Sequence, residues 1–121
     1  MAGVGSFLYA TVDCGDPTAV AAFWAVVLDT EVDLTMDEGR YVFLKGSDTL
    51  PVLCFQRVPE AKGQKNRIHL DLAVEDLDSA TARVLELGGS WPDQTERQWE
   101  DFTWRTLADP EGNEFDVATG A

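Results

Sequence analysis

Two segments decide the fold of this 121-residue chain: YATVDCGDPTAVAAFWAVVLD at residues 9–29 and HLDLAVEDLDSATARVLELGG at residues 69–89. The second repeats the pattern of the first at an offset of 60 residues, which places Asp16 on Asp76. Each aspartate stands where a helix needs its N-cap, because a short side-chain oxygen can accept an unpaired N–H of the first turn. Pro17 then suits the first helical position. Apolar pairs follow at helical spacing: Val20/Ala80, Trp24/Val84 and Val27/Leu87.

Ahead of each aspartate the apolar pattern changes to a period of two, which is typical of a half-buried strand. The residues that alternate with the apolar set point away from the helix, and they include Tyr9 and His69. The apolar sets are Ala10, Val12 and Cys14 in the first half, and Leu70, Leu72 and Val74 in the second.

Three further strands are predicted after each helix. They are expected at residues 30–36, 40–45 and 51–58, and again at 90–96, 102–108 and 111–118. Each half therefore has the order β-α-β-β-β, with modules at residues 5–57 and 66–118 of a single 1–121 domain. This predicts an α+β fold in which the paired modules form a half-open eight-stranded barrel around a cup.

The strand alternation also predicts which side chains line the cup. On the two first strands these are Tyr9 and His69, and on the two last strands they are Gln56 and Asp116. Cys54 and Glu114 lie on the same sides as Gln56 and Asp116, two residues earlier.

Three stretches carry a resemblance to a known family: CGDPTAVAAFW (14–24), NRIHLDLAVEDLD (66–78) and DPEGNEFDV (109–117). They resemble the vicinal oxygen chelate superfamily, which includes glyoxalase I, bleomycin-resistance proteins and extradiol dioxygenases, and within it the small bacterial glyoxalase-like domain proteins. The resemblance implies paired βαβββ modules, a homodimer and, in many members, a divalent metal in the cup.

The same resemblance implies metal ligands at four positions, which here carry Tyr9, Gln56, His69 and Asp116. A phenol is protonated near neutral pH, and an amide oxygen brings no charge. We therefore expect no firmly held cofactor, and a divalent metal, if bound, would take Gln56, His69 and Asp116 as ligands. An extradiol dioxygenase is not expected, since the non-haem iron triad needs two histidines and the chain has one.

His69 has three readings: a metal ligand, a hydrogen-bonding or acid–base group in a ligand cup, or a strand residue tied to Asp71. Histidine is the side chain type best suited to proton transfer near neutral pH, which makes His69 a catalytic candidate, and Glu114 or Asp116 is the candidate base. Cys54 could act as a nucleophile beside His69, although a lone strand cysteine is usually a small core residue. Trp24 is expected in the core, whereas Trp91, Trp99 and Trp104 are expected to wall the cup or a dimer interface.

Composition narrows the class of partner. A net charge of −13 disfavours nucleic acid, no apolar run is long enough to span a membrane, and no signal peptide is indicated. We therefore expect a cytoplasmic protein with reduced cysteines and a small-molecule ligand. The homodimer is what the resemblance implies, and the open edges of the predicted sheet favour it.

Three functions are compatible with these observations. The first is a metal-free binding protein that sequesters a cationic aromatic compound, as resistance-type relatives of the superfamily imply. The second is a metal-dependent lyase or isomerase acting on a carbonyl compound. The third is a structural or regulatory dimer whose cup has no ligand.

Overall fold

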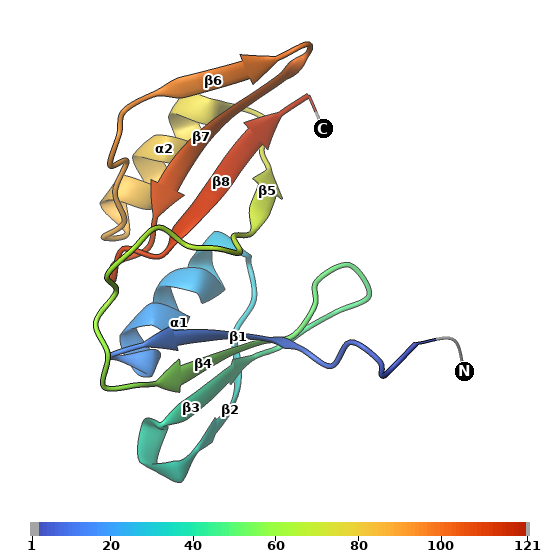
Figure 1. Cartoon of the computed structure of the whole chain (residues 1–121), viewed down its shortest axis with the longest axis vertical. Helices are drawn as coiled ribbons and strands as arrows, with labels where there is room; N and C mark the ends of the chain where they lie inside the picture. Colours follow the sequence, from blue (N-terminus) through green and yellow to red (C-terminus); the bar gives the residue numbers. More distant parts are fainter. Residues whose placement is uncertain (1–2, 121) are drawn as a thin grey trace. The chain divides into compact units, whose positions relative to one another are not determined.

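The computed structural model describes residues 3–120, and its chain divides into two compact units, the first ending at Ala61 and the second beginning at Lys62. Each unit is a four-stranded sheet with one helix (Figure 1). The first contains β1 (Ala10–Cys14), α1 (Pro17–Val27), β2 (Val32–Met36), a short 3₁₀ turn (Asp37–Gly39), β3 (Tyr41–Leu44) and β4 (Leu53–Arg57). The second contains β5 (Asp71–Ala73), α2 (Leu77–Glu86), β6 (Glu96–Trp99), β7 (Phe102–Ala108) and β8 (Glu114–Thr119).

The two sheets have the same topology, which confirms the predicted α+β class and its two βαβββ modules. Their strand orders are β1-β4-β3-β2 and β5-β8-β7-β6. In each sheet the first strand of the module pairs in parallel with the last, and the remaining pairs are antiparallel. The repeat in the sequence is therefore a repeat of strand order.

Both predicted N-caps are present. The Asp16 carboxylate accepts the Ala19 N–H at 3.2 Å, and Pro17 occupies the first turn of α1. The Asp76 carboxylate accepts the Asp78 N–H at 2.9 Å and the Ser79 hydroxyl at 3.0 Å. Each cap turns the chain from strand to helix at the same place in its module.

Replacing Asp76 with alanine is expected to destabilise the protein at pH 7 in a pH-dependent way. The Ser79 hydroxyl, and after it the backbone N–H groups of Asp78 and Ser79, hold the pKa of Asp76 below its usual value. A lowered folded-state pKa gives stability that is present above the unfolded pKa and lost as the pH falls through the folded pKa. Urea unfolding of wild type and variant should therefore converge in acid, and Asp76→Asn, which keeps a cap oxygen without charge, should lie between them. A difference that does not change with pH would contradict this assignment.

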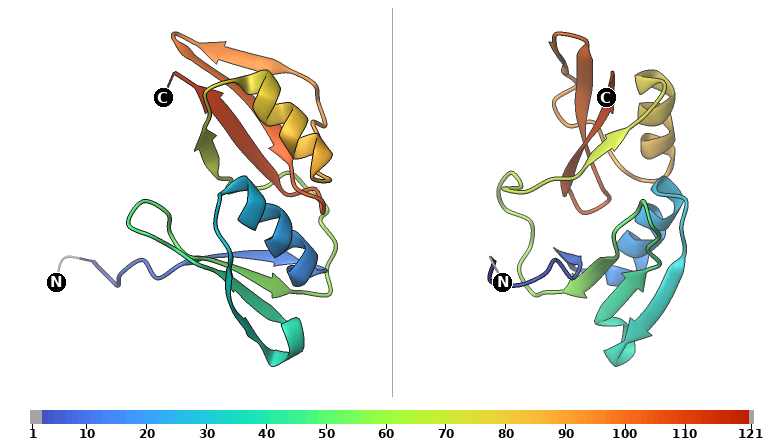
Figure 2. Two further views of the ribbon diagram at one scale, coloured as in Figure 1. Left: turned by 180° about the vertical axis from the view of Figure 1, so that it is seen from behind. Right: turned by 90° about the vertical axis from the view of Figure 1, so that its right-hand side faces the viewer.

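Each helix covers one face of its own sheet, and Figure 2 shows this for α2 most clearly in its right-hand view. Trp24 is in the first core as expected. The predicted alternation of buried and exposed residues does not extend to the two central strands, because residues 53–55 of β4 and 115–118 of β8 are all buried. The largest fully buried side chains are Phe55, Phe115, Leu44, Leu107, Val20, Val42 and Val117. Phe55 and Phe115 occupy equivalent places on β4 and β8, so each core contains a buried phenylalanine at the same position of its module.

The hairpin between β7 and β8 is fixed by a turn at DPEGN, residues 109–113. Asp109 is buried, and its carboxylate accepts the N–H groups of Glu111 at 2.9 Å and Asn113 at 3.0 Å. Gly112 has a φ of +88°, which an L side chain rarely adopts. This turn sets the register that brings Thr106 opposite Asp116.

The strand predicted at residues 90–96 is wrong in position. The structure places β6 at Glu96–Trp99, so the two ranges share only Glu96, and residues 90–95 contain an isolated bridge from Ser90 to Ala108. Pro92 has no N–H to give to a ladder, and the Asp93 carboxylate accepts the Thr95 N–H at 2.9 Å in a local turn. His69 was also predicted to lie on a strand, but β5 begins two residues later, at Asp71. The Asp116 N–H still donates to the Leu70 carbonyl at 2.9 Å, just before that strand.

Arg105 ties α2 to the helix-facing side of its sheet. Its guanidinium bonds Asp78 at 2.7 Å and the Thr81 hydroxyl at 2.9 Å, pairs with Glu96 and lies 4.4 Å from the centre of the Trp91 ring. Trp91 therefore packs against Arg105 on this side of the sheet.

Two further features concern the chain as described. Neither Cys14 nor Cys54 forms a disulfide, and no helix of residues 3–120 has the length and apolarity needed to cross a bilayer.

Candidate functional site

A cavity of about 420 Å³ lies on the second sheet, on the face opposite α2. Its walls come from the segment before β5, from the loop before β6, and from β6, β7 and β8. The cavity is lined at one end by His69 and Asp116 and at the other by Arg97 and Trp104. These residues alternate with the core residues on the same strands, so the strand period that builds the core also builds the pocket.

His69, Asp71 and Asp116 form a cluster, of which His69 and Asp116 line this pocket and Asp71 lies beside them. His69 Nδ1 is 3.4 Å from Asp71 Oδ1 and 3.8 Å from Asp116 Oδ2. Asp71 and Asp116 are direct neighbours in the parallel pairing of β5 with β8. One potential ligand atom from each of the three residues lies within 4.8 Å of the other two.

One carboxylate oxygen of Asp116, Oδ1, already accepts a hydrogen bond from another side chain. The Thr106 hydroxyl donates to Asp116 Oδ1 at 2.7 Å, which orients the carboxylate and leaves Oδ2 on the side of His69. Burial raises the pKa of Asp71, and the neighbouring Asp116 raises it further against the opposing effect of His69. Two carboxylates held this close are stabilised by any positive charge placed between them.

This donor set suits a divalent cation. One imidazole nitrogen and two carboxylate oxygens are ligands that Mn²⁺ and Zn²⁺ accept, and Thr106 is the kind of outer partner that holds a ligating carboxylate in place. Asp71 is not among the four ligand positions that the resemblance implies, and it adds a second carboxylate to His69 and Asp116. The signal was available, because residues two apart on a strand share a face.

Glu114, a candidate base from the sequence, is held by the segment that precedes β5. Its carboxylate pairs with Lys62 Nζ at 3.0 Å and accepts the Asn66 N–H at 2.9 Å, while Lys62 also donates to the Gln64 carbonyl. Burial opposes ionisation, but Asn66 and then Lys62 outweigh it and lower the pKa of Glu114. A carboxylate stabilised in this way is a weak base, and its geometry is that of an anchor for residues 62–66.

Changing Glu114 to glutamine is therefore expected to loosen the segment that carries Lys62 and Lys65. A hydrogen-bonded ion pair of this kind contributes about 1.5–3 kcal/mol, so trypsin should cleave after these lysines about 10-fold faster or more. Mass spectrometry of timed digests measures the rate. Glu75→Gln removes the same charge outside the site and should leave the rate unchanged. Equal rates in both variants would show that the ion pair does not hold the segment.

The three tryptophans with open assignments have different environments. Trp104 lines the pocket, as predicted for a cup wall. Trp99 is 69% exposed, and Trp91 packs under Arg105. Only one of the three is therefore placed to contact a ligand in this cavity.

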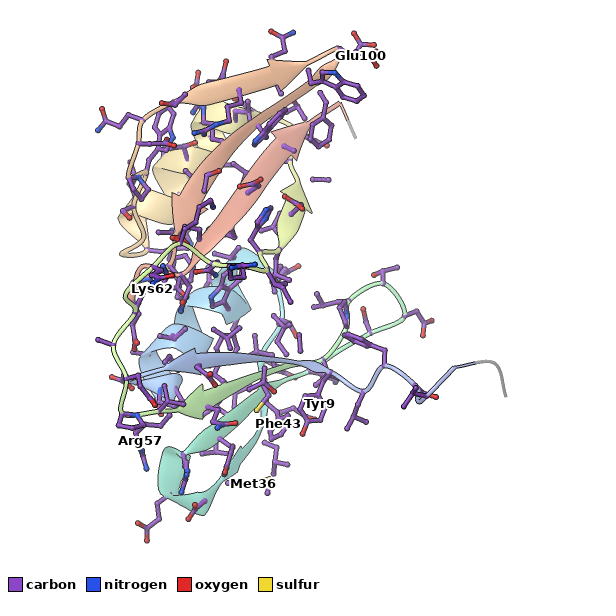
Figure 3. The ribbon with its side chains drawn as sticks, viewed as in Figure 1. Tyr9, Met36, Phe43, Arg57, Lys62 and Glu100 are labelled. Atoms are coloured by element: carbon purple, nitrogen blue, oxygen red, sulfur yellow. The ribbon has the colours of Figure 1, made fainter. Side chains whose placement is uncertain are left out.

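The other predicted site residues, Tyr9, Cys54 and Gln56, belong to the first unit. The Tyr9 ring meets the Phe43 ring edge-on, with 5.2 Å between ring centres (Figure 3). Phe43 is the direct neighbour of Cys54 on β4, and Gln56 lies between Asp13 and Tyr41. Burial raises the pKa of the Cys54 thiol, which makes Cys54 a poor nucleophile at neutral pH. The predicted four-residue metal set is thus divided between the two units.

Comparison with known sequences identifies the family. The family model described as a glyoxalase-like domain matches residues 9–118, nearly the whole chain. This chain belongs to the glyoxalase-like domain family. The resemblance seen in the three sequence stretches is thereby confirmed. No curated protein matches the chain in sequence.

Solved structures share the fold of this glyoxalase-like protein at low sequence identity. A glyoxalase/bleomycin resistance protein/dioxygenase family enzyme from Burkholderia phytofirmans is 16% identical with a TM-score of 0.75, over 94% of this chain and 98% of that one. A mutant of the fosfomycin resistance protein FosX from Listeria monocytogenes, complexed with Mn(II) and a dihydroxypropylphosphonic acid, is 15% identical with a TM-score of 0.77, over 98% and 93%. Lactoylglutathione lyase from Agrobacterium tumefaciens is 20% identical with a TM-score of 0.64, over 97% and 96%.

Proposed function

We propose that this protein binds a small organic molecule in the pocket of its second unit, with a divalent metal ion held by His69, Asp71 and Asp116. The observation that carries the proposal is the convergence of three donor atoms at one end of the pocket, with Thr106 fixing the buried carboxylate. The pocket volume of about 420 Å³ is in the usual range for small-molecule sites. A metal-dependent lyase or isomerase acting on a carbonyl compound is the activity this arrangement favours.

Similar folds support this proposal without deciding it. One FosX structure holds Mn(II), and another similar structure is a lactoylglutathione lyase. When bound, a divalent ion polarises an oxygen of the ligand as a Lewis acid. The chain's own residues would position that oxygen: Trp104 lines the pocket, and His69, Asp71 and Asp116 would hold the ion.

Metal analysis tests the proposal directly. Protein purified without chelator should contain about one divalent ion per chain by plasma mass spectrometry, and metal-stripped protein should take up Mn(II) or Zn(II) in calorimetry. Asp71→Asn should weaken this binding, because one of the two carboxylates loses its charge. The absence of binding at millimolar metal would reject the metal-dependent activity.

A metal-free binding protein is the second candidate, and the acid pair favours it. Asp71 and Asp116 next to a tryptophan-walled pocket could hold the cationic group of an aromatic compound, as resistance-type relatives of this family would. In this case a cationic aromatic compound should quench tryptophan fluorescence in the presence of chelator, and Asp116→Asn should weaken the quenching. Quenching that needs added metal would argue against this candidate.

We also propose that the protein is a cytoplasmic homodimer. Strand β2 is a sheet edge, and its apolar residues Val32, Leu34 and Met36 are each close to half exposed. An apolar edge of this kind favours pairing with another chain or being covered. Light scattering at micromolar concentration should give twice the chain mass of 13.3 kDa, and a monomer would contradict the proposal.

A further inference from the structure

We propose that the ligand carries an anionic oxyacid group, and that Arg97 is the residue that recognises this group at the end of the pocket opposite His69. This inference names the ligand class and rests on the proposal that the pocket binds a small molecule. It does not require that a metal be present. Lys65 lines the same pocket and contributes a second positive charge.

Arg97 is placed by the edge strand of the sheet. It lies on β6, directly opposite Trp104 on β7, and both residues line the cavity. The next row along the same face contains Thr106, Asp116 and Asp71, in that order across β7, β8 and β5. The two edge strands therefore carry opposite charges on this face. Arg97 lies on β6, and Asp71 of the acid cluster lies on β5.

The Arg97 guanidinium is held on one side only. Its Nη2 pairs with Asp93 Oδ2 at 2.7 Å. Asp93 is itself fixed by the Thr95 N–H at 2.9 Å, and the Arg97 hydrogen bond followed by that of Thr95 keeps its pKa below the usual value. The guanidinium is thus pre-oriented by a carboxylate that stays ionised at neutral pH.

The other side of the same guanidinium has no acceptor. Arg97 Nη1 is shielded from water and has no hydrogen-bond partner among the described residues. A donor left in this condition is costly, and such atoms in folded proteins are usually explained by a missing partner. A planar guanidinium suits a carboxylate, phosphate or phosphonate, which can accept from it in pairs. Contact between Nη1 and a bound oxyanion requires a change of side-chain conformation, which is common on binding, and the Arg97 side chain is 41% exposed.

Two of the acids near this pocket are each paired with a cation. Lys62 offsets the charge of Glu114, and Asp93 offsets that of Arg97 through Nη2. The positive charge of Lys65 and the unpaired Nη1 donor of Arg97 therefore remain for a ligand in the pocket. Asp116 is two strands away from β6, which is about 10 Å at the usual strand spacing. A ligand of about this length can place an anionic group at Arg97 and its other end at the His69 cluster.

Three matched probes test the inference on the purified full chain: phenyl phosphate, benzyl alcohol and benzylamine. We expect phenyl phosphate to bind at least about 10-fold more tightly than benzyl alcohol in calorimetry, because charge-assisted hydrogen bonds contribute most of its affinity. Arg97→Gln should remove this advantage, and Arg97→Lys should retain part of it. Arg83→Gln removes the same charge from an exposed site on α2 and should bind like wild type. Circular dichroism confirms that each variant is folded.

The outcomes separate this inference from the proposed function. Tighter binding of benzylamine than of phenyl phosphate, equal affinity in Arg97→Gln and Arg83→Gln, or no binding of any probe would each overturn the anion assignment. Mn(II) uptake in the same samples would still report on the metal site. Conversely, phenyl phosphate binding that depends on Arg97 in chelator-treated protein would support the inference even if no metal binds.

Discussion

Changing Asp116 to asparagine is expected to lower the affinity of the metal-stripped protein for Mn(II) by at least about 100-fold. Mutation of an outer partner of a metal ligand typically costs 10- to 100-fold, so removing the charge of a direct ligand costs at least the upper end of that range. Asparagine has the same shape as aspartate and can still accept the Thr106 hydroxyl, which in wild type lies 2.7 Å from Oδ1. The change is therefore confined to the charge at Oδ2.

The stability of the same variant distinguishes lost binding from lost folding. Asp116 is buried beside Asp71, and removing its charge relieves the repulsion between them. We therefore expect the unfolding free energy of the metal-stripped variant to be equal to or higher than that of wild type. Asp101→Asn, at the exposed turn between β6 and β7, removes the same charge and should change neither quantity. Unchanged Mn(II) affinity in Asp116→Asn would place the ion elsewhere.

Truncating either equivalent core phenylalanine is the second large expected effect. Phe55→Ala and Phe115→Ala should each lower the unfolding free energy by about 3–5 kcal/mol, which is the usual cost of removing a buried ring and leaving a cavity. Both residues are fully buried, at the same place in the two modules. Because a domain has only about 5–15 kcal/mol of stability in total, either variant should unfold at much lower denaturant.

Chemical denaturation followed by tryptophan fluorescence and circular dichroism measures both variants. Phe7→Ala is the matched control, since Phe7 is 77% exposed and its removal should change stability by no more than about 0.5 kcal/mol. A cost below about 1 kcal/mol in Phe115→Ala would show that the second core does not depend on this ring.

Local signals and one internal repeat were enough to predict the fold. The aspartate caps at Asp16 and Asp76, the change from a period of two to a helical period, and the DPEGN turn each depend on residues close together in the chain. Strand alternation also placed His69 and Asp116 on pocket-facing positions, and the structure brings those two together. The same alternation places Asp71 on the face of His69, because the two residues are two apart in the chain.

The error at residues 90–96 has a local cause that hydrophobic pattern alone does not reveal. The turn at Asp93 takes the place of strand pairing at these residues, and β6 begins only at Glu96. In the register that follows, Arg97 lies opposite Trp104, and both residues line the pocket.

The two βαβββ modules, their caps, their cores and the face that carries His69 and Asp116 could all be predicted from the sequence. The polar contacts on that face could not: Asp71 beside Asp116, the Thr106 hydroxyl on Oδ1, and Lys62 with Asn66 on Glu114. The physical reason is the separation along the chain of the residues that interact. Caps and alternation are set within a few residues, whereas these contacts depend on the register between strands that are tens of residues apart, to within the short reach of a hydrogen bond.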